Sequence, residues 1–141
     1  MRVTAQRPEG LAALMRAAAA DELVLQVDGG SMGSTIMAGS EVRVRAVSRP
    51  PRTAEVWAFC NGQGIVVVHR YRRRLPRGGG LQFRGDALPR YDLPIRETQL
   101  IGRVTHVRAA GRTRHFGEAE RIRFILRRAR SRVRGRVTRR G

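Results

Sequence analysis

Between residues 22 and 108 the chain is a series of short runs in which apolar and β-branched residues alternate or follow one another. Each run is bounded by Gly, Pro, Asn or Ser, and this combination is typical of β-strands separated by turns. The pattern predicts strands at 22–27, 41–47, 55–60, 64–71, 81–84 and 99–108. No helical pattern of about 10 to 15 residues separates these runs, as parallel α/β units would require. We therefore expect a mainly β domain with antiparallel strands.

The chain also contains two helical patterns, one on each side of the strand region. Residues 8–20 are rich in helix formers and place Leu11, Leu14 and Met15 on one face, which predicts a short packed helix. Residues 118–140 set apolar side chains at steps of three or four among many arginines, namely Ile122, Leu126, Ala129, Val133 and Val137. This narrow stripe is typical of a basic amphipathic helix at an interface. Two alternatives remain open: a disordered tail, and a helix whose first two turns pack on the sheet.

Asn61-Gly62 separates two of the predicted strands. This dipeptide favours the two-residue hairpin turn in which both central residues have positive φ. We therefore expect a tight hairpin between 55–60 and 64–71.

The length of 141 residues fits a single domain of ordinary size. The formal net charge of +18 is uneven: residues 1–100 hold 15 Arg and 9 acids, whereas residues 101–141 hold 14 Arg and only 2 acids. We divide the chain into a β domain at 1–117 and an Arg-rich segment at 118–141. A basic block of this kind favours a polyanionic partner, either nucleic acid or an anionic membrane surface.

The longest stretch without formal charge, 56–69, is shorter than the roughly 20 apolar residues of a spanning helix. No apolar run of secretory-signal type follows the N-terminal arginines. These observations lead us to expect a cytoplasmic protein. Cys60 is the only cysteine, and its apolar neighbours predict a buried thiol.

Residues 28–36 place glycines before Ser31 at the end of a predicted strand. Glycine lets the backbone turn sharply there and expose both the hydroxyl and the neighbouring N–H groups. Such N–H groups can stabilise the oxyanion of an attacked carbonyl. A Gly-Gly-Ser stretch is also a common loop sequence, so this motif does not establish a nucleophile by itself.

The chain contains no lysine, because all 29 of its basic residues are arginine. A serine hydroxyl attacks a carbonyl only when a neighbouring group takes its proton. Arginine stays charged and cannot accept a proton. Histidine is then the leading base, with an unperturbed pKa of about 6.5. The chain offers only His69, His106 and His115.

Four segments between residues 24 and 108 carry a more specific pattern. They read Gly29-Gly30-Ser31-Met32-Gly33-Ser34-Thr35-Ile36 followed by Gly39-Ser40-Glu41-Val42, then Ala54-Glu55-Val56-Trp57, then Ile65-Val66-Val67-Val68-His69-Arg70, and finally Phe83-Arg84-Gly85-Asp86-Ala87 with Asp92 and Leu100-Ile101-Gly102-Arg103-Val104. In this order they resemble the conserved boxes of the signal peptidase and self-cleaving repressor superfamily of serine peptidases. Two positions depart from the family pattern: Ser34 stands where proline is usual, and Ser40 stands where aspartate is usual.

The resemblance implies a single antiparallel β domain and a peptidase that needs no cofactor or metal. It implies that Ser31 is the nucleophile and His69 the general base, because the base box ends in His-Arg in the endoplasmic-reticulum and archaeal members. A triad also needs a carboxylate to orient the imidazole. The resemblance favours Asp92 for this role and Asp86 as a turn-stabilising residue, with Asp86 as the alternative acid.

The leading hypothesis is therefore a serine endopeptidase that cleaves a peptide or protein substrate. One alternative is a regulatory protein that cleaves itself, for which the alanine run at 17–20 is a faint candidate site. Another is an inactive, peptidase-like binding module, and a third is a nucleic-acid-binding protein that uses its Arg-rich segment. His106, in the last predicted strand, and His115, in a polar Arg-rich loop, lack metal-ligand spacing and are expected to be structural or solvated. Arg70, Arg72, Arg73 and Arg74 form a charged cluster, for which a solvated strand end is favoured over a substrate clamp. The sequence does not define an oligomeric state.

Overall fold

The computed structural model describes residues 7–137, with side chains given as far as Arg134. Its centre is one seven-stranded antiparallel sheet in the order β1-β2-β6-β3-β4-β5, with β7 paired to β6. The strands are β1 (Leu23–Gln26), β2 (Glu41–Arg45), β3 (Val56–Cys60), β4 (Val66–Arg74), β5 (Leu81–Arg84), β6 (Leu100–Ala109) and β7 (Arg112–His115). The predicted mainly β, antiparallel fold class is confirmed.

The six predicted strands are all present, with ends that differ by a few residues. The main error concerns His115, which the sequence placed in a polar loop and which lies in β7. All four β7 residues are exposed, so this strand has none of the apolar alternation by which strands are recognised. It forms because a tight turn at Ala110 and Gly111, both with positive φ, folds it back onto β6.

Strand β6 joins the two halves of the sheet. One edge of β6 pairs with β2, and the other edge pairs first with β3 and then with β7. Gly102 permits this close packing, because a Cβ at that position would lie 2.4 Å from the backbone oxygen of Arg45. The early β1–β2 unit and the later β3–β4–β5 unit are therefore neighbours only through β6.

Strand β3 is buried along its whole length, since apolar residues pack against both of its faces. Val56, Ala58 and Cys60 belong to a core that includes α1 and the β2 and β6 side chains. Trp57 and Phe59 belong to a second, aromatic core with residues of β4 and β5. The predicted burial of the Cys60 thiol is confirmed, and burial raises its pKa.

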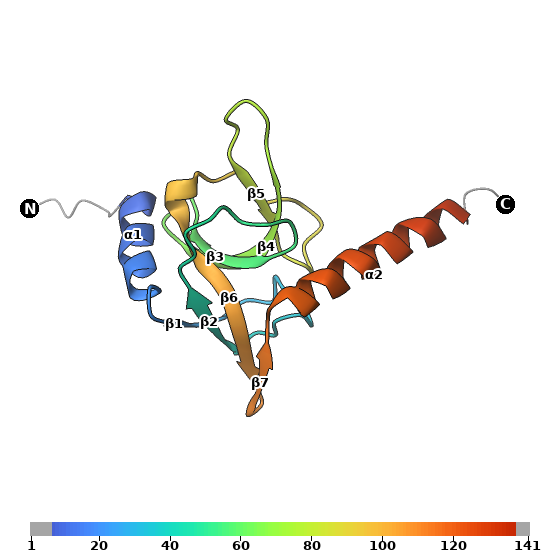
Figure 1. Ribbon diagram of the computed structural model, residues 1–141, viewed down its shortest axis with the longest axis horizontal. Coiled ribbons are helices and arrows are strands. Elements are labelled where there is room, and N and C mark those ends of the chain that lie inside the picture. The colour runs from blue at the N-terminus through green and yellow to red at the C-terminus, as the bar shows by residue number, and fades with distance from the viewer. Residues whose placement is uncertain (1–6, 138–141) are drawn as a thin grey trace, which may run out of the picture.

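Helices α1 (Pro8–Ala18) and α2 (Glu118–Val137) lie at opposite sides of the sheet (Figure 1). Helix α1 ends two residues before the predicted boundary. Helix α2 starts where expected, while positions 138–140 of the predicted helix lie outside the described residues. Its first turns pack on the body and the rest projects away from it (Figure 1), which agrees with the packed alternative. A short 3-10 helix, η1 (Glu97–Gln99), precedes β6.

The hairpin between β3 and β4 is present, but its predicted two-residue turn is wrong. Neither Asn61 nor Gly62 has positive φ, and the left-handed residue is Gly64. The Asn61 carboxamide oxygen accepts hydrogen bonds from the backbone N–H groups of Gln63 and Ile65, both at 3.0 Å. This side-chain cap stabilises a longer loop than the dipeptide rule assumes.

Between residues 7 and 137, no helix combines the length and the apolar character needed to cross a membrane.

Candidate active site

Ser31 lies in the loop between β1 and β2, and this loop is anchored by the residues that follow the serine. Met32 and Ile36 are fully buried in the core next to α1. The carbonyl oxygen of Ser31 accepts a hydrogen bond from the backbone N–H of Ala87 at 3.0 Å. Buried apolar anchors and this backbone bond hold the serine in place without using its hydroxyl.

His69, on β4, lies between Ser31 and Asp92. Its Nε2 atom is 2.9 Å from Ser31 Oγ, and its Nδ1 atom is 2.5 Å from Asp92 Oδ2. An ionised carboxylate can only accept hydrogen bonds, so Nδ1 carries the proton that is donated to Asp92. Nε2 is then left as an acceptor for the Ser31 hydroxyl proton. The three predicted site residues are thus brought into contact, with His69 in the middle.

The surroundings of His69 fix the ring in this orientation. The side chain is only 6% exposed, and the ring of Phe59 packs edge-on against it with centroids 6.2 Å apart. The backbone N–H of Asp92 donates to the Phe83 carbonyl oxygen at 2.9 Å, which ties the acid to the end of β5. His69 and Asp92 are therefore both held by the sheet.

Gly85 lies between the loop that carries Ser31 and the His69 side chain. A Cβ at this position would lie 2.5 Å from the Ser31 carbonyl oxygen and 3.1 Å from His69 Nε2. Distances below 3.0 Å are essentially never adopted by real Cβ atoms. Only glycine therefore allows the two segments to approach closely enough for the Ser31–His69 hydrogen bond.

Asp86, the alternative acid, has other partners. Its carboxylate accepts hydrogen bonds from Arg70 Nε and Nη2 at 2.9 and 2.7 Å, and from Thr35 Oγ1 at 2.8 Å. It makes no hydrogen bond to His69 among those that the structure contains. Asp86 thus links the turn after β5 to the nucleophile loop, while Asp92 is the carboxylate behind the imidazole.

The sequence interpretation of Arg70 as part of a solvated cluster is wrong. The residue is 1% exposed, and its guanidinium also binds Glu120 of α2, with Nη1 and Oε1 2.6 Å apart. Burial acts to lower the pKa of Arg70, but the hydrogen bonds to Asp86 and Glu120 outweigh it and raise that pKa. The ring of Phe124 lies 3.9 Å from the guanidinium carbon. The first turn of α2 is therefore connected to the site through one buried cation.

Two backbone groups of the nucleophile loop are available to an oxyanion. Within residues 7–137, the N–H groups of Gly30 and Ser31 have no hydrogen-bond partner. Both N–H groups directly precede the Ser31 side chain along the backbone, and consecutive amides of this kind can form an oxyanion hole.

A cleft of about 590 Å³ opens beside His69 and Asp92. Its apolar walls come from Phe59, Val67 and Leu93, and Leu93 is 88% exposed. A pocket with mostly apolar walls next to reactive polar groups is the usual form of a ligand site.

The two departures from the family pattern differ in their surroundings. Ser34 is exposed, so a serine is accommodated there without a packing conflict. Ser40 is 2% exposed, and its hydroxyl has no hydrogen-bond partner in the described part of the chain.

His106 and His115 do not join the site. They face each other across β6 and β7 with ring centroids 5.0 Å apart. Over the described range 7–137, no group of three or more His, Cys, Asp or Glu residues could hold a metal ion.

No protein-family model matches this sequence, and a search of curated proteins found no match.

Proposed function

We propose that this chain is a serine endopeptidase, similar to the signal peptidase superfamily, in which Ser31, His69 and Asp92 form the catalytic triad. The observation that carries the proposal is the pair of contacts of His69, 2.9 Å to Ser31 Oγ and 2.5 Å to Asp92 Oδ2. Nucleophile and base are within the distance that proton transfer requires. The absence of lysine from the sequence independently favours a histidine base.

In the proposed reaction the substrate binds as an extended strand and its scissile carbonyl approaches Ser31. Ser31 Oγ forms a bond to the carbonyl carbon while His69 Nε2 takes the hydroxyl proton, and Asp92 stabilises the imidazolium. The N–H groups of Gly30 and Ser31 stabilise the oxyanion. The intermediate collapses when His69 protonates the leaving amine. Water, deprotonated by His69, then releases the acyl group and restores Ser31.

The substrate of this proposed peptidase is a peptide or protein whose side chain enters the cleft beside His69. Family resemblance implies small residues, typically alanine, next to the scissile bond. We place the enzyme in the cytoplasm, where it would mature a peptide or partner protein.

The test is incubation of the full chain with a proteome-derived peptide library, followed by mass spectrometry of new termini. We expect cleavage by the wild type and at least a thousandfold loss in Ser31→Ala and His69→Ala, because triad members act as a unit. Ser34→Ala is the matched control, since it removes an exposed hydroxyl from the same loop and should cleave normally. Equal cleavage by Ser31→Ala, or no cleavage by either wild type or Ser34→Ala, would contradict the proposal.

The self-cleavage alternative is less well supported. Its candidate segment at 17–20 overlaps the end of α1, and Ala19 is fully buried in the core. An extended substrate conformation at this segment would require the helix end to unfold first. We therefore favour cleavage of a separate polypeptide.

We also propose that the solvent-facing side of α2 contacts an anionic membrane surface. Ile122, Leu126 and Val133 are 47%, 52% and 62% exposed, at helical spacing among arginines. An apolar stripe within a basic helix is the pattern of an interfacial anchor. Sedimentation with phosphatidylglycerol vesicles should decrease when Ile122, Leu126 and Val133 are changed to Ser. Unchanged sedimentation would show that the stripe has no membrane role.

A further inference from the structure

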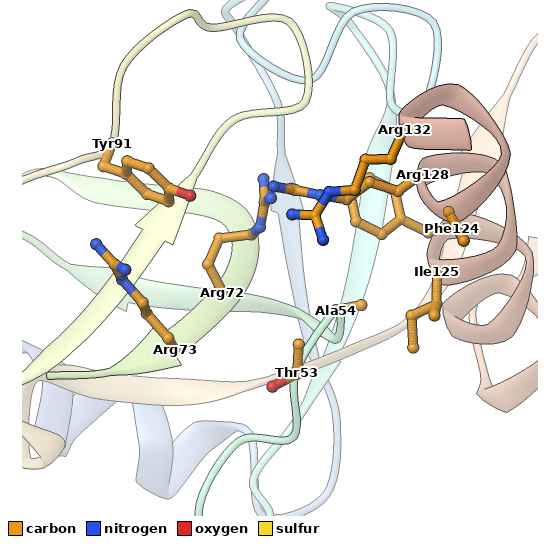
Figure 2. Close-up of a pocket in the computed structure, with 10 residues that line it drawn as sticks. Thr53, Ala54, Arg72, Arg73, Tyr91, Phe124, Ile125, Arg128 and Arg132 are labelled. Atoms are coloured by element: carbon orange, nitrogen blue, oxygen red, sulfur yellow. The ribbon is translucent and has the colours of Figure 1, made fainter. Parts of the chain in front are cut away.

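Beside the candidate active site, α2 and the sheet enclose two adjoining hollows lined by arginine. The first has a volume of about 380 Å³ and lies between α2, the end of β4 and the loop that carries Tyr91 (Figure 2). The second, about 440 Å³, continues from it towards Thr35 and Asp86. Both are lined by Arg72, Phe124 and Arg128. We call the two hollows together the arginine groove.

The groove concentrates positive charge that the described residues do not neutralise. Arg72, Arg128 and Arg132 line it, and within residues 7–134 none of them pairs with a carboxylate. In Figure 2, Arg128 and Arg132 reach from α2 towards Arg72 on β4. The one acid in the lining, Asp86, is already bound by Arg70 and Thr35.

Three arginines of the groove lining, Arg72, Arg73 and Arg84, also gather around a single aromatic ring. The guanidinium carbons of Arg72, Arg73 and Arg84 lie 5.6, 5.3 and 5.6 Å from the centre of the Tyr91 ring. Any two of them are therefore within about 11 Å of each other, a separation comparable with the screening length of about 10 Å at 0.1 M salt. Arginines held in place at this spacing repel one another unless an anion binds between them.

The second hollow of the groove lies beside the candidate active site. Asp86, in its lining, directly precedes Ala87, whose backbone N–H donates to the Ser31 carbonyl oxygen at 3.0 Å, and Thr35, also in its lining, is in the loop that carries Ser31. A polypeptide lying across Ser31 and His69 therefore reaches the groove a few residues from its scissile bond.

From this geometry we propose that the arginine groove binds an acidic segment of the polypeptide substrate, an inference that rests on the peptidase function proposed above. Planar guanidinium groups match carboxylates through paired N–H donors. Carboxylates on short side chains can enter a recessed hollow, whereas a flat membrane surface meets the exposed side of α2 instead. The groove is thus a specificity determinant that selects Asp or Glu near the cleavage site.

Single-stranded nucleic acid fits the groove less well. Such ligands bind by stacking their bases on aromatic faces as well as by phosphate contacts. The two rings of the groove are already occupied, because Arg70 lies 3.9 Å from the centre of Phe124 and three guanidinium groups surround Tyr91.

The test measures binding of a fluorescein-labelled ten-residue peptide of alternating Glu and Ala to the full chain carrying Ser31→Ala, so that the result does not depend on hydrolysis. The groove variant adds Arg72→Gln, Arg128→Gln and Arg132→Gln. The control variant adds Arg108→Gln, Arg123→Gln and Arg130→Gln, which remove the same charge from one strand and two α2 positions outside the groove. Circular dichroism establishes that all three proteins are folded.

We expect the Kd for the Glu peptide to rise at least tenfold in the groove variant and less than threefold in the control variant. A peptide with Gln in place of Glu should bind weakly to the Ser31→Ala chain and to both variants. An equal rise in both variants would overturn the proposal, because the attraction would then come from general charge. It would also be overturned if the groove variant lost binding to oligo-dT or phosphatidylglycerol vesicles but kept the Glu peptide.

A second readout separates this proposal from the proposed function. Peptides cleaved from the library should be enriched in Asp or Glu near the cut, and the enrichment should disappear when the three groove substitutions are made with Ser31 intact. Cleavage without any such enrichment would refute the groove proposal and leave the peptidase function standing. Binding of the acidic peptide by the groove without any cleavage of the library would support the groove as an acidic-peptide site and refute the peptidase function.

Discussion

Substitution of Gly85 by alanine tests whether close contact between two loops sets the distance from nucleophile to base. The added Cβ would lie 2.5 Å from the Ser31 carbonyl oxygen, and real Cβ atoms keep at least 3.0 Å from other heavy atoms. The loops must therefore separate by at least about half an ångström, a lower limit set by sterics. If Ser31 takes up this shift, the 2.9 Å contact with His69 lengthens to the limit of a hydrogen bond.

The expected consequence is a loss of kcat on the order of tenfold to a hundredfold, because displacement of a reacting group by about 1 Å can cost a hundredfold. Stability should also fall by about 1 to 3 kcal/mol, as for other overpacked sites. The assay combines urea unfolding with steady-state cleavage of a peptide identified from the library, with rates expressed per folded molecule.

Gly102→Ala is the matched control for this prediction. Its Cβ would meet the backbone oxygen of Arg45 at 2.4 Å, an equally severe clash at a position in β6 that touches no site residue. We expect Gly102→Ala to lose stability and keep its kcat. The reasoning is refuted if Gly85→Ala loses stability but retains the wild-type kcat, or if both variants lose kcat equally.

Three further predictions concern single carboxylates and one hydroxyl. Asp92→Asn should lower kcat on the order of a thousandfold or more, because the imidazole loses its orienting acceptor. Asp86→Asn should mainly lower the melting temperature. A large loss of kcat in Asp86→Asn with a normal kcat in Asp92→Asn would exchange their roles. Ser40→Ala should leave stability unchanged or raise it by about 1 kcal/mol in urea unfolding, since the buried hydroxyl has no partner among the described residues; a loss above that size would reveal a hidden bond. Burial acts to raise the pKa of Glu55, but hydrogen bonds from Arg49 and the Arg52 amide outweigh it and lower that pKa to about 2. The resulting stabilisation, about 3 kcal/mol, is complete above pH 4.5 and is lost as pH falls towards 2; stability that stays constant between pH 5 and 2.5 would contradict this assignment.

The sheet was predictable because its strands carry the apolar alternation that burial on one face imposes, or the continuous apolar run that burial on both faces allows. Strand β3 shows this most clearly, since all of its residues are buried and the sequence marks it as one run. Strand β7 could not be predicted in this way, because its four exposed residues owe their conformation to pairing with β6. The Asn61 turn was misassigned for a related reason: a side-chain cap, and not the dipeptide's own preference, determines the loop.

The structure brings Ser31, His69 and Asp92 into contact, whereas the network of residues that supports them was not predicted. Ser31 and His69 are marked by short local motifs whose residue types match their chemistry. Glu120 is 50 residues from Arg70, in a segment dominated by arginine, and no local pattern connects the two. A usable signal was the scarcity of acids in this segment. Only two carboxylates stand among the 14 arginines after residue 100, so each carboxylate could be expected to pair with a specific arginine.

The position of β6 has a consequence for the timing of assembly during translation. Ser31 belongs to the β1–β2 unit, whereas His69 and Asp92 belong to the β3–β5 unit, and only β6 lies between the two in the sheet. A ribosome completes all three residues before it makes Leu100–Ala109. The growing chain thus holds every member of the candidate triad while still lacking the strand that joins their two units of the sheet. The order of the elements along the gene therefore delays completion of the sheet around the candidate site until most of the polypeptide has been synthesised.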